Sequence, residues 1–436
     1  MKNNILGKKI IIILGWLVVW QLVSVCVGNH ILLVGPLETL QTVILLLPKV
    51  SFWSACLGSL LRIGAGFGAG MLLGILLAAC SAKYKWIEEL LAPPMSLLKA
   101  VPVASFVVIF LIWWGSAQLA TVISFCIVLP NLYVNTLEGL KSTDKKLLEM
   151  AQVFDMPVKN RFFYIYRPAL RPFWDSAMKL AAGMSWKSGV AAEVIGLPEH
   201  AIGEQLYMSK IYLDTAGVLA WTLVTVLLSV LFEKAILYLW KCFCRWEPYC
   251  QRSGKPQDIM QPGKTLQLKN VRKVFADKVI LEDVSAEYEP GRVYYFKNPS
   301  GWGKTTLFRL VAGLEKPDGG TVEGQGMQCG VLFQEDRLCE EYSALKNVEM
   351  VTGNPQTARE HLLQLLEEAD ISKPCKELSG GMKRRVALAR AMAANADILL
   401  LDEPLNGLDE ANRERIREYI EKHREDRIVL LASHIE

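Results

Sequence analysis

Six long apolar runs in the first 240 residues constrain the fold of this chain more than any other feature. They are Ile10–Gly28, Phe52–Cys80, Leu97–Trp114, Leu119–Tyr133, Phe173–Ile195 and Thr215–Trp240. A run of about 20 apolar residues is long enough to cross a bilayer as one helix. The sequence therefore predicts an all-α polytopic membrane domain of six helices at residues 1–245. The first run could also be a signal peptide, but it lacks a clear cleavage pattern of small residues, so we interpret it as a retained helix.

Positive charges gather on one side of the predicted spans. On that side lie Lys8, Lys9, Lys83, Lys85, the stretch from Lys141 to Arg171, Lys241 and Arg245. The opposite loops hold little beyond Lys49 and Lys210. Because cytoplasmic loops carry the excess of Lys and Arg, we expect a multi-pass protein of the cytoplasmic membrane with both termini in the cytoplasm.

Composition excludes several classes of function. The net charge of +4 says little about nucleic acid, because most acidic residues lie after Pro256 and no basic stripe with interleaved aromatics is present. No nucleic-acid partner is therefore expected. The ten cysteines are scattered, several inside apolar runs, which argues against a disulfide scaffold. Cys242, Cys244 and Cys250 lack zinc-type spacing and a nearby His, so we expect no metal there.

The chain turns polar after the last apolar run. Residues 246–264 contain several prolines and glycines and no apolar period, which is typical of a linker. Thr265–Val274 and Val279–Val284 then indicate the opening strands of a second domain at residues 265–436.

A glycine-rich loop near the start of this domain indicates phosphate binding. Gly301 and Gly303 allow a tight turn that points backbone N–H groups at a β-phosphate, Lys304 bridges the β- and γ-phosphates, and Thr305 offers its hydroxyl to Mg²⁺. The residues expected around the nucleotide are Asn298, Pro299, Ser300, Gly301, Trp302, Gly303, Lys304, Thr305 and Thr306. Asn298 replaces the usual first glycine, and since Asn tolerates the left-handed region we expect the loop to keep its shape.

Two later motifs narrow down the class of phosphate-binding protein to which the second domain is similar. Leu378-Ser-Gly-Gly-Met382 and Leu399-Leu-Leu-Asp-Glu-Pro404 follow the loop, and in this order the three resemble the motifs of ABC transporters. Ser379, Gly380 and Gly381 open a helix whose N–H groups and positive dipole end suit a γ-phosphate. In the family that phosphate belongs to ATP bound on the partner copy. Asp402, after a buried apolar strand, would hold the Mg²⁺ shell, and Glu403 would be the general base.

The resemblance assigns four further residues. Phe275 would stack on adenine, and Gln334, after Val331-Leu-Phe333, would report the nucleotide to the membrane domain. Asp409 would lie in the loop that crosses the dimer interface, and His434, beyond the strand Ile428–Ala432, would contact the γ-phosphate during catalysis. Taken singly, Phe275 would be a core aromatic and His434 a surface residue, but order and spacing favour the functional interpretation. ATP and Mg²⁺ are the expected cofactors, with Thr305, Gln334 and Asp402 on the metal side.

A cytoplasmic loop at residues 141–171 resembles the Glu-Ala-Ala loop of ABC importer permeases, a short helix that docks into a cleft of the ATPase. Leu147–Met156 and Tyr164-Ile-Tyr-Arg-Pro-Ala169 carry the resemblance. Glu149 and Ala151 match the motif, whereas Met150 and Asp155 depart from it, the latter replacing the usual Gly. The alternative is a solvated amphipathic loop.

Two stretches of the membrane half are similar to permeases for nitrate, sulfonate, taurine, bicarbonate and thiamine-precursor uptake. They are Pro93–Pro102 with Trp113-Trp-Gly115, and Ser185-Trp-Lys-Ser-Gly-Val-Ala-Ala-Glu193. Lys187 and Glu193 fall in the fifth predicted span, where an ionisable group is costly and usually faces a pathway or a partner. Either these two side chains pair with each other, or they contribute to a translocation path.

These features predict a fused half-transporter, in which a six-helix importer-type permease precedes a RecA-like α/β ATPase with an inserted helical subdomain. The resemblance implies ATP-driven uptake of a small solute by a homodimer in the lipid bilayer, with an extracytoplasmic solute-binding protein as partner. An exporter is one alternative, disfavoured because the cytoplasmic loops are short. A non-transporting ATP-dependent membrane regulator is the other, disfavoured by the intact Lys304, Asp402 and Glu403.

Overall fold

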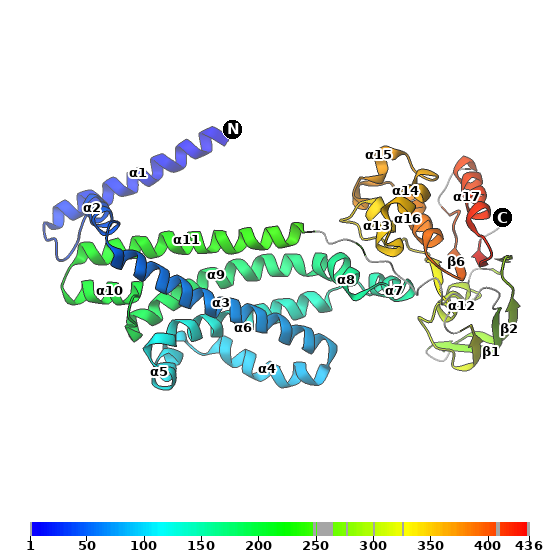
Figure 1. Ribbon diagram of the computed structural model, residues 1–436, viewed down its shortest axis with the longest axis horizontal. Helices are drawn as coiled ribbons and strands as arrows, with labels where there is room; N and C mark the ends of the chain where they lie inside the picture. The colour runs from blue at the N-terminus through cyan, green and yellow to red at the C-terminus, as the bar shows by residue number, and fades with distance from the viewer. Residues whose placement is uncertain are drawn as a thin grey trace. The chain divides into compact units, whose positions relative to one another are not determined.

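A computed structural model describes residues 2–246, 250, 265–275, 278–299, 301–324, 327–406 and 410–433, which form two compact units (Figure 1). The first unit comprises residues 1–142 and 170–246, and the second comprises residues 143–169 and 247–436. The loop that follows the fourth apolar run, which the sequence predicts to be cytoplasmic, therefore belongs to the same unit as the C-terminal domain.

The first unit is all-helical, which confirms the fold class predicted for this half. Its helices are α1 (Lys2–Val27), α2 (Pro36–Leu46), α3 (Val50–Lys83), α4 (Lys85–Ala100), α5 (Val103–Trp114), α6 (Ser116–Lys141), α9 (Arg167–Gly196), α10 (Ile202–Ile211) and α11 (Thr215–Arg245). Among the described residues, α3, α6 and α11 are long and apolar enough to cross a membrane, and α4 with α5 would make a fourth, bent span. The number of six spans remains a prediction.

The apolar run Leu97–Trp114 does not form one helix, so that part of the prediction is wrong. Helix α4 ends at Ala100, α5 begins at Val103, and their axes differ by 105°. Val101 between them is extended, with φ −74° and ψ 129°. The ring of Pro102 disfavours the helical conformation for the residue before it, so the helix ends there.

A glycine stripe lets α3 approach α6 closely (Figure 1). A Cβ at Gly66 would lie 2.1 Å from the carbonyl oxygen of Thr121, and Cβ atoms at Gly70 and Gly74 would lie 3.0 and 2.9 Å from carbonyl oxygens of α6. The spacing of four residues puts the three glycines on one face of the helix. Small residues at such positions allow the backbones of membrane helices to meet.

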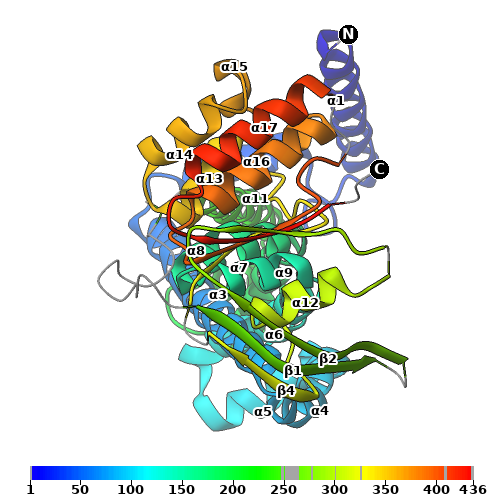
Figure 2. The same cartoon turned by 90° about the vertical axis from the view of Figure 1, so that its right-hand side faces the viewer.

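The second unit contains two sheets (Figure 2), and its α/β class is confirmed. An antiparallel sheet has the order β2-β1-β4, with β1 at Leu266–Phe275, β2 at Lys278–Tyr288 and β4 at Gly319–Glu323. A parallel sheet has the order β3-β7-β6-β5, with β3 at Val293–Phe296, β5 at Cys329–Leu332, β6 at Ile398–Asp402 and β7 at Ile428–Ala432. Strands β5, β6 and β7 are short and buried at every residue, and all their residues are apolar except Asp402 at the end of β6, as expected of parallel strands covered on both faces.

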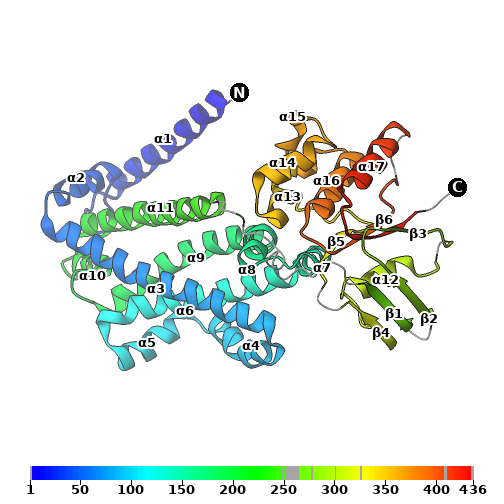
Figure 3. The same ribbon diagram turned by 45° about the vertical axis from the view of Figure 1, so that its right-hand side comes forward.

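Helices surround the parallel sheet (Figure 3). They are α12 (Lys304–Val311), α13 (Ala344–Thr352), α14 (Pro355–Leu363), α15 (Glu368–Ile371), the 3₁₀ helix η3 (Cys375–Glu377), α16 (Gly380–Ala393) and α17 (Glu410–His423). The segment 143–169 adds α7 (Lys145–Val153), α8 (Val158–Arg161) and the π-helix η1 (Phe162–Tyr166). We call this segment the docking segment.

The parallel strands bring the sequence motifs to one edge. The phosphate loop follows β3, residues 333–337 follow β5, and Glu403 follows β6. We call residues 333–337 the β5 loop. Ligands of such sheets bind outside the carboxyl ends of the strands, so this edge is where a nucleotide site is expected.

Candidate nucleotide site and docking site

The phosphate loop joins β3 to α12 through two left-handed glycines. Gly301 has φ +84° and Gly303 has φ +99°, a region that glycine occupies without steric cost. A Cβ at Gly303 would also lie 2.9 Å from side-chain atoms of Ile280 and Leu281. Lys304 follows as the first residue of α12, and its Nζ donates to the carbonyl oxygen of Asn298 at 2.6 Å. The loop therefore wraps around the lysine that the sequence singles out.

The conformational argument for Asn298 is wrong. Asn298 is not one of the described non-glycine residues that have a positive φ. This residue contributes its carbonyl group to the loop and has no left-handed strain that a glycine would relieve. Pro299 is exposed, and the Trp302 ring lies 6.5 Å from that of Phe296. Ser300 lies outside the described residues.

Thr305 and Asp402 meet between α12 and the end of β6. The Thr305 hydroxyl donates to Oδ2 of Asp402 at 2.9 Å. The pKa of the Asp402 carboxyl is raised above its ordinary value, mainly because the group is buried. The charge of Glu403 also raises this pKa, whereas the hydrogen bond from Thr305 lowers it. A hydroxyl and a carboxylate in contact are oxygen ligands of the kind that Mg²⁺ prefers.

Glu403 occupies a strained backbone conformation directly after β6. Its φ is +52°, although it is not glycine. Its N–H donates to the carbonyl oxygen of Ala432 at 2.9 Å, and Asn406 Nδ2 donates to its carboxylate at 3.0 Å. Such outliers cost free energy and persist where the surroundings enforce them, often at functional sites.

Ser379 caps the exposed start of α16. Its Oγ accepts a bond from Met382 N at 3.4 Å, and a Cβ at Gly380 would meet nothing within 4 Å. Ser379 and Gly380 are exposed and Gly381 is half-buried. The N–H groups of this helix start are therefore accessible from outside the unit.

Of the other residues expected at the nucleotide site, three lie in the described part of the chain. Phe275 is 43% exposed, with Lys273 Nζ 5.0 Å from its ring centroid, so the core-aromatic alternative is wrong. Thr306 is half-buried in α12 and Gln334 is exposed in the β5 loop. Asp409 and His434 lie outside the described residues.

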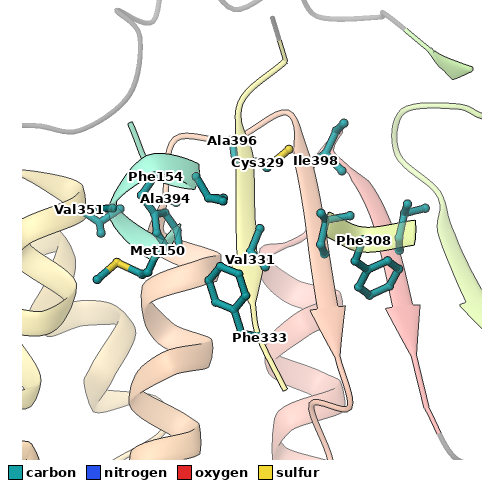
Figure 4. Packing of buried hydrophobic residues seen from close by; sticks show 14 of the residues in the cluster. Met150, Phe154, Phe308, Cys329, Val331, Phe333, Val351, Ala394, Ala396 and Ile398 are labelled. Carbon is teal, nitrogen blue, oxygen red and sulfur yellow. The ribbon is translucent and has the colours of Figure 1, made fainter. Parts of the chain in front are cut away.

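The docking segment packs on the ATPase unit through the apolar face of α7. Met150, Ala151 and Phe154 are buried, and Figure 4 places Met150 and Phe154 beside Val351, Ala394 and the strand β5. The alternative of a solvated loop is therefore wrong. Asp155 after the helix has φ +46°, a conformation that Asp tolerates and Gly adopts freely.

Glu149 on α7 is held by two arginines. Arg309 of α12 donates twice to its carboxylate at 2.9 Å, and Arg337 of the β5 loop donates once at 2.7 Å. The hydrogen bond from Arg309 is the main cause that holds the pKa of Glu149 below its usual value, with Arg337 contributing and desolvation opposing. Sequence reasoning identified Glu149 but missed both partners, because they lie 160 and 188 residues away.

Further contacts fix the rest of the docking segment. Lys146 pairs with Glu335 at 2.6 Å, and Asn160 Nδ2 donates to the carbonyl oxygen of Met350 at 3.0 Å. Cys250, from the predicted linker, is fully buried and donates to the Tyr164 hydroxyl at 3.1 Å. One end of the predicted linker is thus anchored on the docking segment.

One cavity of about 240 Å³ touches both the docking segment and the nucleotide residues. Its lining includes Lys146, Arg309, Thr305, Gln334 and Asp402. The polar groups around Glu149 and the Thr305–Asp402 pair are therefore separated by a single small space. Movement of the β5 loop would alter both sides at once.

In the first unit, Lys187 and Glu193 do not pair. Glu193 is fully buried, accepts a bond from Ser59 Oγ at 2.6 Å and lies 3.4 Å from Arg62. Arg62 also donates to the carbonyl oxygens of two residues that follow α9. Lys187 is exposed on α9. The predicted alternative of a Lys187–Glu193 pair is wrong, because the Glu193 carboxylate pairs with Arg62 of α3 instead.

Both halves match known protein families. Residues 281–406 match the family described as "ABC transporter", and residues 70–239 match "Binding-protein-dependent transport system inner membrane component". The aliphatic sulfonates import ATP-binding protein SsuB 1 of Rhodococcus jostii (strain RHA1) is 39% identical over 180 residues, which are 39% of this chain and 72% of the relative. The chain belongs to the ABC transporter family. This ABC transporter carries an importer-type permease domain and an ATP-binding domain that hydrolyses ATP in support of transport.

Two other relatives of this ABC transporter bear on the direction of transport. SsuB 3 of the same Rhodococcus strain is 36% identical over 192 residues, covering 42% of this chain and 68% of the relative. The Nod factor export ATP-binding protein I of Cupriavidus metallidurans is 33% identical over 190 residues, covering 39% of this chain and 62% of that protein. Because the ATPase half is similar to import and export components alike, the permease match is what favours import.

Proposed function

We propose that two copies of this chain form a transporter that takes up a small solute of the sulfonate, nitrate, bicarbonate or thiamine-precursor class at the expense of ATP. An extracytoplasmic solute-binding protein would deliver the solute, and both termini would lie in the cytoplasm, as the distribution of Lys and Arg favours. The observation that carries the proposal is the docking segment held by Arg309 and Arg337 on the ATPase unit. It supports a direct mechanical link between permease and ATPase within one chain.

The residues of the ATPase unit fit ATP and Mg²⁺. The left-handed Gly301 and Gly303 bring backbone N–H groups around Lys304, which would neutralise phosphate charge. Thr305 and Asp402, in contact at 2.9 Å, would hold the metal, which supplies charge neutralisation for phosphoryl transfer. Glu403 would orient the attacking water, with His434 beside the γ-phosphate, and Phe275 would stack on the base.

The exposed start of α16 supports a site completed by a second copy. Ser379, Gly380 and Gly381 would bind the γ-phosphate held by the partner's phosphate loop, with Asp409 near the same interface. A chain with Lys304→Ala and a chain with Ser379→Arg would each be inactive as homodimers. Their mixed dimer would contain one site with both defects and one with neither.

Co-expression of these two variants tests the proposal. We expect recovery of part of the ATPase activity in the purified mixed dimer, and none when either variant is expressed alone. Full ATPase activity in a strictly monomeric preparation of the unaltered chain would contradict the shared site.

Sulfonate is the solute class that we favour, because the two import relatives described above, SsuB 1 and SsuB 3, are named for aliphatic sulfonates. Lys187, exposed on a helix of the membrane unit, supplies a positive charge suited to an anionic solute on the translocation path. Calorimetry of candidate binding proteins with alkanesulfonate, nitrate, bicarbonate and an aminopyrimidine would distinguish the classes. Binding of the aminopyrimidine alone would overturn the choice of sulfonate.

A further inference from the structure

Arg384 joins three parts of the ATPase unit through one guanidinium group. It lies on α16 and is only 7% exposed. Its Nη1 donates to the carbonyl oxygen of Phe333 at 2.6 Å and pairs with the Asp336 carboxylate at 3.1 Å, both in the β5 loop. Its Nη2 donates to the carbonyl oxygens of Asp402 and of Glu403, the latter at 3.0 Å. Arg384 thus bonds both to the β5 loop and to the backbone of Asp402 and Glu403 at the end of β6.

The β5 loop is also held from the docking side. Arg337 donates to the Glu149 carboxylate at 2.7 Å. Arg390, fully buried on α16, donates at 2.8 Å to the carbonyl oxygens of both Asp336 and Arg337. Its guanidinium carbon lies 5.5 Å from the ring centroid of Phe154 in the docking segment. The β5 loop is therefore bonded to α7 on one side and to α16 on the other.

The peptide that Arg384 holds is the strained one. Glu403 has φ +52°, and the two carbonyl groups bonded by Arg384 flank this residue's Cα. A non-glycine residue stays in such a conformation only when its surroundings enforce it. The planar fork of Arg can bond several carbonyl groups at fixed angles, which the single ammonium of Lys cannot do.

We propose that Arg384 is a positioning residue that makes the orientation of Glu403 depend on the docking segment. The inference rests on the proposed role of Glu403 as general base. When the docking segment holds the β5 loop, Arg384 keeps the peptide after β6 in place. The Glu403 carboxylate is then aligned to orient the attacking water. When the segment shifts, the loop and Arg384 shift with it, and the carboxylate loses its alignment. The route runs through backbone carbonyl groups and does not require the Gln334 side chain.

A double-mutant cycle on the full chain in lipid nanodiscs tests this route. Arg384→Gln should lower kcat for ATP hydrolysis on the order of 100-fold, as expected for a misplaced catalytic group, and leave KM within about twofold. Glu149→Gln alone should lower kcat, but in the Arg384→Gln background it should change kcat by less than about twofold, because the route is already broken. Independent, multiplicative effects of the two changes would overturn the proposal.

Arg427→Gln is the matched control. Arg427 is also a buried arginine, 8% exposed, and it donates to the carbonyl oxygens of Met392 and Ala394 at the other end of α16. Its loss should lower the unfolding temperature much as Arg384→Gln does, while kcat and its response to Glu149→Gln stay unchanged. If Arg384→Gln does not fold, Asp336→Asn removes only the ion pair and should show the same loss of coupling in milder form.

Glu403→Gln, measured in parallel, separates this inference from the proposed function. If Glu403→Gln keeps near wild-type hydrolysis, the proposed role of Glu403 as general base and the inference about Arg384 both fail. If Glu403→Gln abolishes turnover while Arg384→Gln leaves kcat unchanged, the transport function stands and the inference about Arg384 is wrong.

Discussion

Replacing Glu149 by Gln should release the docking segment from the ATPase unit without changing the shape of the side chain. The carboxylate accepts three hydrogen bonds, two from Arg309 at 2.9 Å and one from Arg337 at 2.7 Å. Nη1 of Arg309 and Nη1 of Arg337 both donate to Oε2, so an amide oxygen at that position would keep two of the bonds, without the negative charge, while the amide nitrogen at the Oε1 position would lose the third. Arg309 retains Glu315 at 3.3 Å, whereas Arg337, only 11% exposed, loses its carboxylate partner.

The size of the effect follows from one lost hydrogen bond, from the lost negative charge on the other two, and from the exposure of the side chain. Hydrogen bonds to charged groups contribute about 1.5–3 kcal/mol each. With the Glu149 side chain 29% exposed, we discount the lost bond and the lost charge on the other two bonds for solvent screening to roughly 2–3 kcal/mol in total. Since about 1.4 kcal/mol corresponds to a factor of ten, the docked state should lose roughly 30- to 150-fold in its equilibrium with the undocked state.

Hydrogen exchange of the α7 amides, measured by mass spectrometry on the full chain in nanodiscs, reports this equilibrium. We expect Glu149→Gln to accelerate exchange by the same factor. Lys146→Ala is the control, because the Lys146–Glu335 pair joins the same surfaces but its side chains are 54% and 58% exposed, and such pairs contribute at most about 1 kcal/mol. Equal acceleration by the two changes would refute the reasoning.

Four other outcomes can be checked directly. Glu403→Gln should keep ATP binding and abolish turnover, measured by nucleotide binding and phosphate release, whereas retained hydrolysis would remove Glu403 from the mechanism. Asp155→Gly should stabilise the docking segment by up to about 1 kcal/mol in thermal unfolding, because glycine adopts φ +46° freely. Gly66→Ala should destabilise the membrane unit by about 1–3 kcal/mol, since its Cβ would lie 2.1 Å from a carbonyl oxygen, while Gly68→Ala, with nothing within 4 Å, should be tolerated. Finally, because the pKa of Glu149 is lowered on docking, its contribution is complete above the ordinary carboxyl pKa of about 4.3 and is lost as pH falls through the depressed value, so α7 exchange corrected for intrinsic rates should accelerate only below about pH 4.3.

The sequence predicts local features of this chain well. Apolar runs and the order of the three ATPase motifs indicate both fold classes, because spans and phosphate loops depend on contiguous residues. The run Ile428–Ala432 emerges as strand β7 for the same reason. Pro102 could also have been used, since it marks the break that divides Leu97–Trp114.

Pairings between distant residues could not be predicted in this way. Glu193 lies on the same helix as Lys187 and close to it in sequence, yet it pairs with Arg62, 131 residues earlier. Arg384 belongs to a basic triplet that looks like a solvated charge run, and only the fold places its guanidinium among the carbonyl groups of two separate loops. Asn298 shows the converse error, because residue preference suggested a left-handed conformation that its neighbours do not require.

The division of the chain into units has a consequence for how fragments of the protein associate and for the ratio of its two domains. The backbone passes from one unit to the other after residues 142, 169 and 246. A cut engineered within residues 251–264 would leave a first fragment that still contains the docking segment and Cys250, both buried in the unit formed with the second fragment. The two pieces should therefore stay associated through gel filtration without a peptide bond. The fusion also fixes the stoichiometry, because each translated chain carries one permease domain and one ATPase domain in a ratio of one to one.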